Sequence, residues 1–239
     1  MFRVRLDVST PAPERVRVEG AALHHLRVAR VVPGEKVEVF DGLGRAWAGL
    51  LETMDDGGAV LRLGEERRGA TGRPVVLIQG LPKGDKLEWV LQKATELGVS
   101  AVWPVVTARS VARPKPEAVG ARHARWQRIA EEAARQSGRA EVPEVASLRP
   151  LDEAVKALTP GVRLLVLDEE ERSDRLRPAA GDGAVAIVVG PEGGLAREEV
   201  ESLRGLGGVP VSLGPLVLRT ETAGIAALAV LRHLDGLLG

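Results

Sequence analysis

Short continuous apolar runs alternate with segments of helical periodicity from residue 75 to the end of the chain. The runs at residues 75–79, 163–167 and 184–189 contain almost no polar side chains. A strand has this composition when helices cover both faces of its sheet, because both sets of its side chains are then buried. Strands that alternate with helices are typical of a parallel sheet. This region therefore predicts an α/β domain with helices on both sides of the sheet.

The helix after the first run has clear signals at both ends. Asp85 can cap its N-terminus together with Glu88 three residues later, and Gly98 can follow its last turn. In between, apolar residues recur on one helical face. The same patterns predict further strands at residues 101–106 and 209–213, and helices at residues 117–136, 151–158, 197–206 and 220–234.

Residues 1–72 have a different pattern, with apolar and polar side chains alternating every second residue. This alternation is typical of half-buried strands. Residues 41–44 (DGLG) form a turn signal between two of them, and residues 65–72 predict a charged linker. The expected strands lie at residues 2–6, 15–18, 36–40, 46–51 and 59–63, with one short helix at residues 22–29. We expect a compact β-barrel that ends at residue 72.

Composition excludes several classes of protein and site. The chain has no Cys, which rules out disulfides and thiolate chemistry and favours a cytoplasmic location. No apolar run reaches the roughly 18–20 residues that cross a membrane, so we expect no membrane partner. The four His show no metal-ligand spacing with carboxylates, so we expect no metal.

Basic residues gather in two zones, although the net charge is zero. One zone lies in residues 1–30. In the other, residues 109–128, Glu117 is the single acid among six basic residues. Such zones fit local contacts with an anionic partner, and they also fit ordinary solvated surfaces.

A glycine-rich loop, residues 190–194 (GPEGG), follows the apolar run at 184–189 and precedes a predicted helix. Ligands of open α/β sheets bind where loops leave the carboxyl ends of the strands. Glycines there allow the backbone to approach a ligand closely. The loop lacks the Gly-Lys-Ser/Thr of a phosphate-binding P-loop, and the chain lacks the G-x-G-x-x-G of dinucleotide binding. Taken alone, the loop could also be a simple turn.

A second loop, residues 213–219, leads into the last helix. Thr220 is suited to the N-cap of that helix and Glu221 to its first turn. Arg219 is less easily explained, because the helix dipole disfavours a cation at this end. A cation there can serve an anionic ligand, although a surface arginine is also compatible with the sequence.

Together these segments resemble the SPOUT superfamily, and within it the ribosomal RNA small subunit methyltransferase E family, which methylates N3 of a uridine in 16S ribosomal RNA. The resemblance covers nearly the whole chain. It is carried by a series of motifs in a fixed order: residues 24–27 (HHLR), 31–35 (VVPGE), 83–86 (KGDK), 92–98 (QKATELG), 109–110 (RS), 132–139 (EAARQSGR), 190–194 (GPEGG) and 218–223 (LRTETA).

The resemblance implies an α/β protein with a PUA-like β-barrel at residues 1–72 for RNA binding and a SPOUT methyltransferase domain with a trefoil knot at residues 73–239. It also implies a homodimer that binds S-adenosylmethionine in the knot. Carried onto this sequence, the cofactor-binding residues are Leu167, Gly190, Glu192, Gly193, Gly194, Leu213, Gly214, Leu216 and Leu218. Leu216 departs from the family, which commonly has a basic residue there.

Catalysis in this reading falls to Arg219, which could stabilise the anionic uracil ring, and to Glu221 as a candidate general base. Glu221 also fits a purely structural role at the start of the helix. The expected partner is 16S rRNA, within the small ribosomal subunit. The expected RNA-binding residues are Arg3, Arg5, His24, Lys86, Arg109, Arg113, Arg122, Arg125 and Arg128.

Two other functions are compatible with parts of the sequence. A catalytically inactive ribosome assembly factor could keep the methyltransferase fold and bind RNA alone, although the intact GPEGG and RTET motifs argue against it. A nucleotide-binding oxidoreductase would need the dinucleotide fingerprint that the chain lacks.

Overall fold

The computed structural model describes residues 1–69, 72–171 and 175–239. Its chain divides into two units. The N-terminal unit comprises Met1–Ala70 together with Ala134–Val142, and the C-terminal unit comprises Thr71–Ala133 and Pro143–Gly239.

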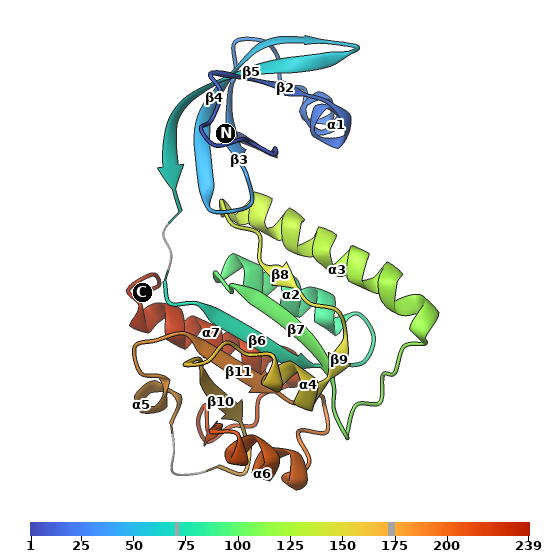
Figure 1. Ribbon diagram of the computed structural model, residues 1–239, viewed down its shortest axis with the longest axis vertical. Helices are drawn as coiled ribbons and strands as arrows, with labels where there is room; N and C mark the ends of the chain where they lie inside the picture. The colour runs from blue at the N-terminus through green and yellow to red at the C-terminus, as the bar shows by residue number, and fades with distance from the viewer. Residues whose placement is uncertain (70–71, 172–174) are drawn as a thin grey trace. The chain divides into compact units, whose positions relative to one another are not determined.

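The N-terminal unit is built on one five-stranded sheet with the strand order β1-β3-β4-β5-β2 (Figure 1). Its elements are β1 (Phe2–Arg5), β2 (Arg15–Val18), α1 (Gly20–Val28), β3 (Lys36–Phe40), β4 (Arg45–Asp55) and β5 (Gly58–Arg68). All pairs are antiparallel except β1 with β3. The core draws on all five strands and α1, with Trp47, Leu26 and Leu61 almost fully buried. These elements agree with the expected PUA-like region.

The charged stretch at residues 65–68 is part of a strand, so the prediction of a linker there was wrong. β5 continues to Arg68, which pairs with Arg45 at the start of β4. The two strands are eleven residues each, and backbone pairing with β4 stabilises the charged half of β5 although its side chains are exposed. Residues 70–71 of the expected linker lie outside the described residues.

The C-terminal unit contains a seven-stranded parallel sheet, with the order β12-β10-β11-β6-β7-β8 and β9 also paired with β7. Its strands are β6 (Val75–Gly80), β7 (Ala101–Val106), β8 (Glu144–Val145), β9 (Arg149–Pro150), β10 (Arg163–Leu167), β11 (Val185–Val189) and β12 (Val209–Val211). Its helices are α2 (Lys86–Glu96), α3 (Pro116–Ser137, whose last turn belongs to the N-terminal unit), α4 (Leu151–Lys156), α5 (Leu176–Ala180), α6 (Arg197–Gly205) and α7 (Thr220–Leu234).

Alternate side chains of the central strands enter two different layers. Ile78, Val166 and Val188 pack in one core cluster with residues of α4 and α6. On β6, Leu77 faces the opposite way, and its side chain lies 3.0 Å from where a Cβ of Gly224 in α7 would be. Helices therefore cover both faces, which explains why these strands are continuous apolar runs.

The start of α2 differs in detail from the sequence prediction. Asp85 is the N-cap residue, but its side chain makes no capping hydrogen bond, and the amide of Glu88 donates to the Asp85 carbonyl oxygen instead. The predicted end is confirmed, since Gly98 has a φ of +82° immediately after the helix. A glycine is favoured there because a side chain would strain this backbone conformation.

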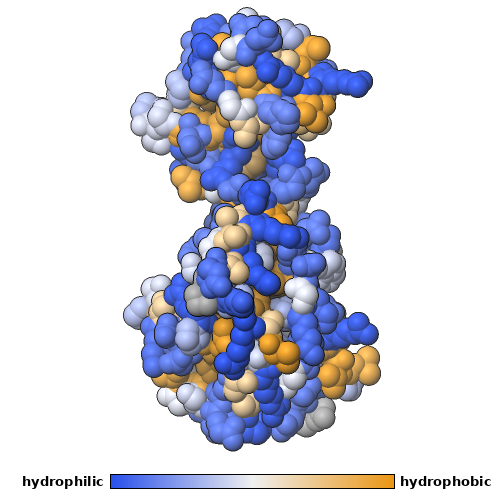
Figure 2. Space-filling model, turned by 90° about the vertical axis from the view of Figure 1, so that its right-hand side faces the viewer, coloured by the Kyte–Doolittle hydropathy of each residue, from blue (hydrophilic) through white to orange (hydrophobic). Residues whose placement is uncertain are grey.

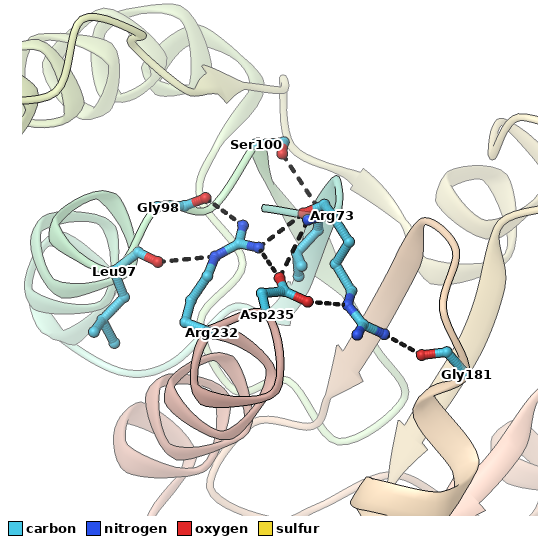
Figure 3. A network of polar contacts seen from close by, with 8 residues as sticks. Arg73, Leu97, Gly98, Ser100, Gly181, Arg232 and Asp235 are labelled. Carbon is cyan, nitrogen blue, oxygen red and sulfur yellow. Dashed lines mark hydrogen bonds and ion pairs between the residues drawn. The ribbon is translucent and has the colours of Figure 1, made fainter. Parts of the chain in front are cut away.

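A buried network of charged side chains anchors the C-terminal end of α7 (Figure 3). Arg232 is 3% exposed and donates to the carbonyl oxygens of Leu97 and Gly98 at the end of α2. Asp235 binds Arg232 at 2.9 Å and Arg73 at 2.6 Å. The network therefore ties α7 to α2 and to the segment that enters β6.

Among the described residues, none of the helices has the length and apolar character needed to span a membrane. The face shown in Figure 2 is largely hydrophilic, with hydrophobic residues in small groups.

Candidate functional site

A cavity of about 360 Å³ lies in the C-terminal unit, at the carboxyl ends of β10, β11 and β12. The segments that follow these three strands supply most of its lining, and the first turn of α7 supplies the rest together with Lys86, Arg109 and Arg197. Parallel strands place their carboxyl ends at the same edge, so loops far apart in sequence meet there.

The loop after β11 has no room for a side chain at its first glycine. A Cβ at Gly190 would lie 2.6 Å from the carbonyl carbon of Gly194. The loop turns back through a hydrogen bond from the amide of Gly194 to the carbonyl oxygen of Pro191, and Gly194 has a φ of +68°. Gly190 thus allows the tight turn that presents the loop's backbone to the cavity, and a larger residue at position 190 would distort this turn.

Thr220 joins this loop to α7 and to the central strand β6. Its hydroxyl donates to the carbonyl oxygen of Gly190 at 2.6 Å and accepts a hydrogen bond from the amide nitrogen of Gln79 at 2.9 Å. The predicted N-cap role of Thr220 was wrong: Arg219 occupies the N-cap position and Thr220 is the first helical residue. Its side chain is turned inward because both of its partners are buried.

A buried ion pair supports the side of the cavity formed after β10. The Asp168 carboxylate is 3% exposed and accepts two hydrogen bonds from Arg197, at 2.7 and 2.9 Å. Burial raises the pKa of Asp168, but the bonds from Arg197 and from the amide of Glu170 outweigh that effect and hold it below its usual value. This bidentate pair joins the segment after β10 to the start of α6.

Three charged side chains from three different segments meet at another part of the lining. The Lys86 ammonium lies 3.0 Å from a Glu192 oxygen and 3.4 Å from Glu221 Oε2. The hydrogen bond with Glu192 chiefly raises the pKa of Lys86. Burial raises the pKa of Glu192, but Lys86 and the Lys83 amide outweigh that effect and lower it. Lys86 and Glu192 are therefore both charged near neutral pH.

The two arginines near the loop differ in their contacts. Arg109 donates to the carbonyl oxygen of Gly193 at 2.8 Å. Arg219 is exposed on the cavity wall, and within the described part of the chain no hydrogen bond or ion pair involves its side chain. Arg219 is thus available to an anionic group.

Most residues that the resemblance assigned to cofactor and catalysis meet at this cavity. The lining includes both catalytic candidates, Arg219 and Glu221. It also includes eight of the nine predicted cofactor residues: Leu167, Gly190, Glu192, Gly194, Leu213, Gly214, Leu216 and Leu218. Gly193 is not part of the lining. Leu216 is 77% exposed, so its apolar side chain lies at the open edge of the site.

The RNA-binding candidates of the C-terminal unit lie in two places. Lys86 and Arg109 line the cavity. Arg122, Arg125 and Arg128 are exposed on α3, where their spacing of three residues puts them on adjoining turns. Arg125 forms an ion pair with Glu88 at 2.7 Å. Arg113 is exposed in the segment before α3.

The candidates of the N-terminal unit differ in exposure. His24 and Arg5 are exposed. The Arg3 side chain is only 12% exposed, since its guanidinium binds Glu38 and the carbonyl oxygens of Ala134, Arg135 and Arg139. These contacts give Arg3 a structural role within this unit.

Sequence reasoning missed Asp168 and Arg197. Asp168 directly follows the buried strand β10, and a carboxylate at the carboxyl end of a parallel strand is a signal that could have been used. Its pairing with Arg197, 29 residues later, depends on how the two segments meet in space.

Comparison with known families finds matches along most of the chain. The model of an RNA methyltransferase domain matches residues 70–232, and that of an RNA methyltransferase PUA domain matches residues 18–64.

Two curated relatives carry the name ribosomal RNA small subunit methyltransferase E. That of Bacillus subtilis is 40% identical over 69% of this chain and 67% of its own length. That of Mycobacterium bovis is 37% identical over 86% of this chain and 80% of its own length. Among solved structures, the enzyme of the same name from Neisseria gonorrhoeae, bound to S-adenosyl methionine, superposes with a TM-score of 0.90. It is 33% identical, with 98% of each chain covered.

Proposed function

The chain belongs to the ribosomal RNA small subunit methyltransferase E family, and we propose that it transfers a methyl group from S-adenosylmethionine to N3 of a uridine in 16S rRNA. The observation that carries the proposal is the single cavity wall that brings together the loop at residues 190–194, the loop at residues 213–218 and Arg219. The substrate places its action in the cytoplasm, on the small ribosomal subunit.

The cavity fits a cofactor that is held mainly by backbone atoms. Gly190 has no room for a Cβ because the loop folds back tightly on its own backbone at Gly194, and this turn lies at the cavity. We assign cofactor binding to this loop, Leu167 and residues 213–218. When bound, S-adenosylmethionine supplies a methyl group on a positively charged sulfur. The wall carries both carboxylates and basic side chains, so a ligand with groups of both charges can find partners there.

The chain's own residues supply charge stabilisation and proton transfer. Arg219 has no competing partner in the described part of the chain, so its guanidinium can stabilise the negative charge that develops on the uracil oxygens as N3 loses its proton. Glu221, two residues further along the same wall, can accept that proton. In an in-line displacement, a protein accelerates the reaction mainly by holding the reacting groups in the correct positions.

RNA binding is assigned to basic residues of both units, of which Arg109 also lines the cavity. Arg109, Arg113, Arg122, Arg125 and Arg128 can bind phosphates, which position an RNA without reading its sequence. Arg5 and His24, which are exposed in the proposed RNA-binding domain at residues 1–72, are assigned to RNA contacts as well. We assign Arg3 an indirect part in RNA binding, because its guanidinium holds the backbone at Arg139 in place.

A trefoil knot is also part of the proposal. β12 is an edge strand, whereas the next element, α7, packs against β11 and β6 in the middle of the sheet. The segment between β12 and α7 therefore returns toward the middle of the sheet. It passes beside the loop at residues 190–195, where Thr220 donates a hydrogen bond to Gly190. These observations support a threaded arrangement.

We further propose that the protein is a homodimer that associates through α7. One face of this helix carries apolar residues that the described chain leaves partly exposed: Ile225, Ala226, Ala229 and Val230. An exposed apolar helical face of this kind is typical of an interface.

The proposal is tested by calorimetric titration of the purified protein with S-adenosylmethionine, with NAD as the control ligand. We expect saturable binding of the donor and none of NAD. Gly190→Ala should abolish binding, because its Cβ would clash with the backbone of Gly194. The matched variant Gly205→Ala should bind normally, since a Cβ there meets nothing within 4 Å. A protein that binds neither ligand, or a Gly190→Ala variant with normal affinity, would contradict the assigned cradle.

A further inference from the structure

Lys86 is held by two carboxylates and is poorly placed to hold a phosphate. Its ammonium contacts Glu192 at 3.0 Å and Glu221 at 3.4 Å. Two carboxylates and one ammonium leave a local charge of −1. Both neighbours would oppose a phosphate at Lys86, because they already neutralise the ammonium and like charges a few ångströms apart repel.

Glu192, Lys86 and Glu221 form a chain of contacts in which each residue holds the next. Glu192 is held at the start of this chain by a hydrogen bond from the Lys83 amide at 3.1 Å. Glu192 in turn bonds the Lys86 ammonium at 3.0 Å. Lys86 begins α2, so the ammonium is held between a helix and the loop after β11, and it contacts Glu221 from that position.

Glu221 keeps unused capacity to accept a proton. Its side chain is 16% exposed, and Oε2 is buried without a hydrogen bond, because the contact with Lys86 is an ion pair without hydrogen-bond geometry. No other hydrogen bond to this carboxylate occurs within the described residues.

We propose that Lys86 is a positioning residue that holds the Glu221 carboxylate ready to take the N3 proton, which rests on the function proposed above. The proton of N3 passes to a Glu221 oxygen, and the electron pair left on N3 forms the new bond to the methyl carbon. The pair of the broken carbon–sulfur bond stays on the sulfur, which becomes neutral. Glu221 then returns its proton to solvent.

The first test compares Lys86→Met with Lys86→Arg and with the control Lys93→Met. Lys93 is on the same helix, outside the cavity lining, and among the described residues its side chain pairs with Glu96 alone. Lys86→Met should lower kcat roughly tenfold or more, as for a misplaced general base, with KM for RNA unchanged. Lys86→Arg should recover part of the loss because the cation is kept. Lys93→Met should behave as the unaltered protein.

RNA binding without turnover gives a second readout. A residue that contacts one phosphate contributes a slope of about 0.7–0.9 to the plot of log affinity against log salt. Lys86→Met should leave this slope unchanged. A slope reduced by that amount, with a higher KM and normal kcat, would overturn the proposal and make Lys86 an RNA contact.

A double-mutant cycle closes the test. If Lys86 acts through Glu221, adding Lys86→Met to Glu221→Gln should slow the reaction no further than Glu221→Gln alone, which we expect to cost about 100-fold. Independent, multiplying losses would overturn the positioning role. If the unaltered protein binds S-adenosylmethionine but methylates no ribosomal RNA, the proposed function fails instead. In that case, the coupling energy between Lys86 and Glu221, measured by urea unfolding of the same variants, still tests the ion pair itself.

Discussion

Thr220 donates a hydrogen bond over 2.6 Å to the carbonyl oxygen of Gly190, although the two residues are 30 positions apart. The same hydroxyl accepts from Gln79 on the central strand β6. One side chain thus fixes the first turn of α7, the glycine loop and the sheet relative to one another. The two loops of the proposed cofactor cradle are held together at this point.

Thr220→Val should loosen the cradle while preserving side-chain shape. The buried carbonyl of Gly190 and the amide of Gln79 would each lose a partner, at a cost of about 1–3 kcal/mol in the free energy of unfolding. Affinity for S-adenosylmethionine should fall roughly tenfold, equal to about 1.4 kcal/mol. Calorimetry and urea unfolding measure the two effects. Thr220→Ser keeps the hydroxyl and should restore both, so a serine variant as impaired as the valine variant would contradict this explanation.

Arg219→Ala should lower turnover by about 100-fold or more with donor binding preserved, as for the loss of one electrostatic donor at a developing charge. Single-turnover methylation of RNA measures the rate, and calorimetry measures the binding. Arg204→Ala is the matched control, because Arg204 pairs with Glu171 and Glu201 away from the cavity lining. Near-normal turnover in the Arg219 variant would remove Arg219 from the catalytic machinery.

Asp235 should make the C-terminal unit sensitive to acid. Burial raises the pKa of Asp235, but the hydrogen bonds from Arg73 and Arg232 outweigh it, so the folded pKa lies below its usual value (Figure 3). The stabilisation is therefore complete above the unfolded pKa of about 3.9 and is lost as the pH falls through the folded pKa. Asp235→Asn should cost about 3–5 kcal/mol at pH 7, since it removes the carboxylate that neutralises two largely buried arginines.

Urea unfolding of the unaltered protein and the Asp235 variant at pH 7 and near pH 3 measures this effect. The difference in the free energy of unfolding between the two proteins should be smaller at the lower pH. Asp152→Asn is the control, because its ion pair with Lys156 is exposed and its removal should change little. A difference that stays constant with pH would show that the Asp235 charge does not provide the stabilisation.

Val230→Glu should weaken the proposed dimer by at least about 100-fold in the dissociation constant, because a charge would be buried without a partner. Sedimentation velocity over a range of concentrations measures it. Leu206→Glu introduces the same charge at another exposed apolar residue, outside α7, and should leave the dimer intact. An unaltered protein that sediments as a monomer throughout would contradict the interface.

The regular elements could be predicted from sequence where local periodicity determines them. β10 and α7 occupy the residues expected, 163–167 and 220–234. The short strands β8 and β9 were not expected, because two residues carry no periodicity and their pairing depends on β7. The extension of β5 was missed for a related reason: its charged residues are kept in a strand by the long partner β4.

The site could be predicted only as far as the motifs extend along the chain. The glycine loop and the segment 213–219 were found because each is a local signal. The contacts that organise them were not, since Thr220 with Gly190, Asp168 with Arg197 and Lys86 with Glu221 join segments distant in sequence. The inward turn of Thr220 likewise depends on buried partners that no cap signal reveals.

Transfer of a labelled methyl group from S-adenosylmethionine to 16S rRNA tests the central claim most directly. Small ribosomal subunits and protein-free 16S rRNA, both lacking the modification, would be incubated with the protein, and the product nucleosides identified by mass spectrometry. We expect label in a single 3-methyluridine, dependent on Arg219. Donor binding without label in either RNA, or label on another atom, would contradict the proposed function.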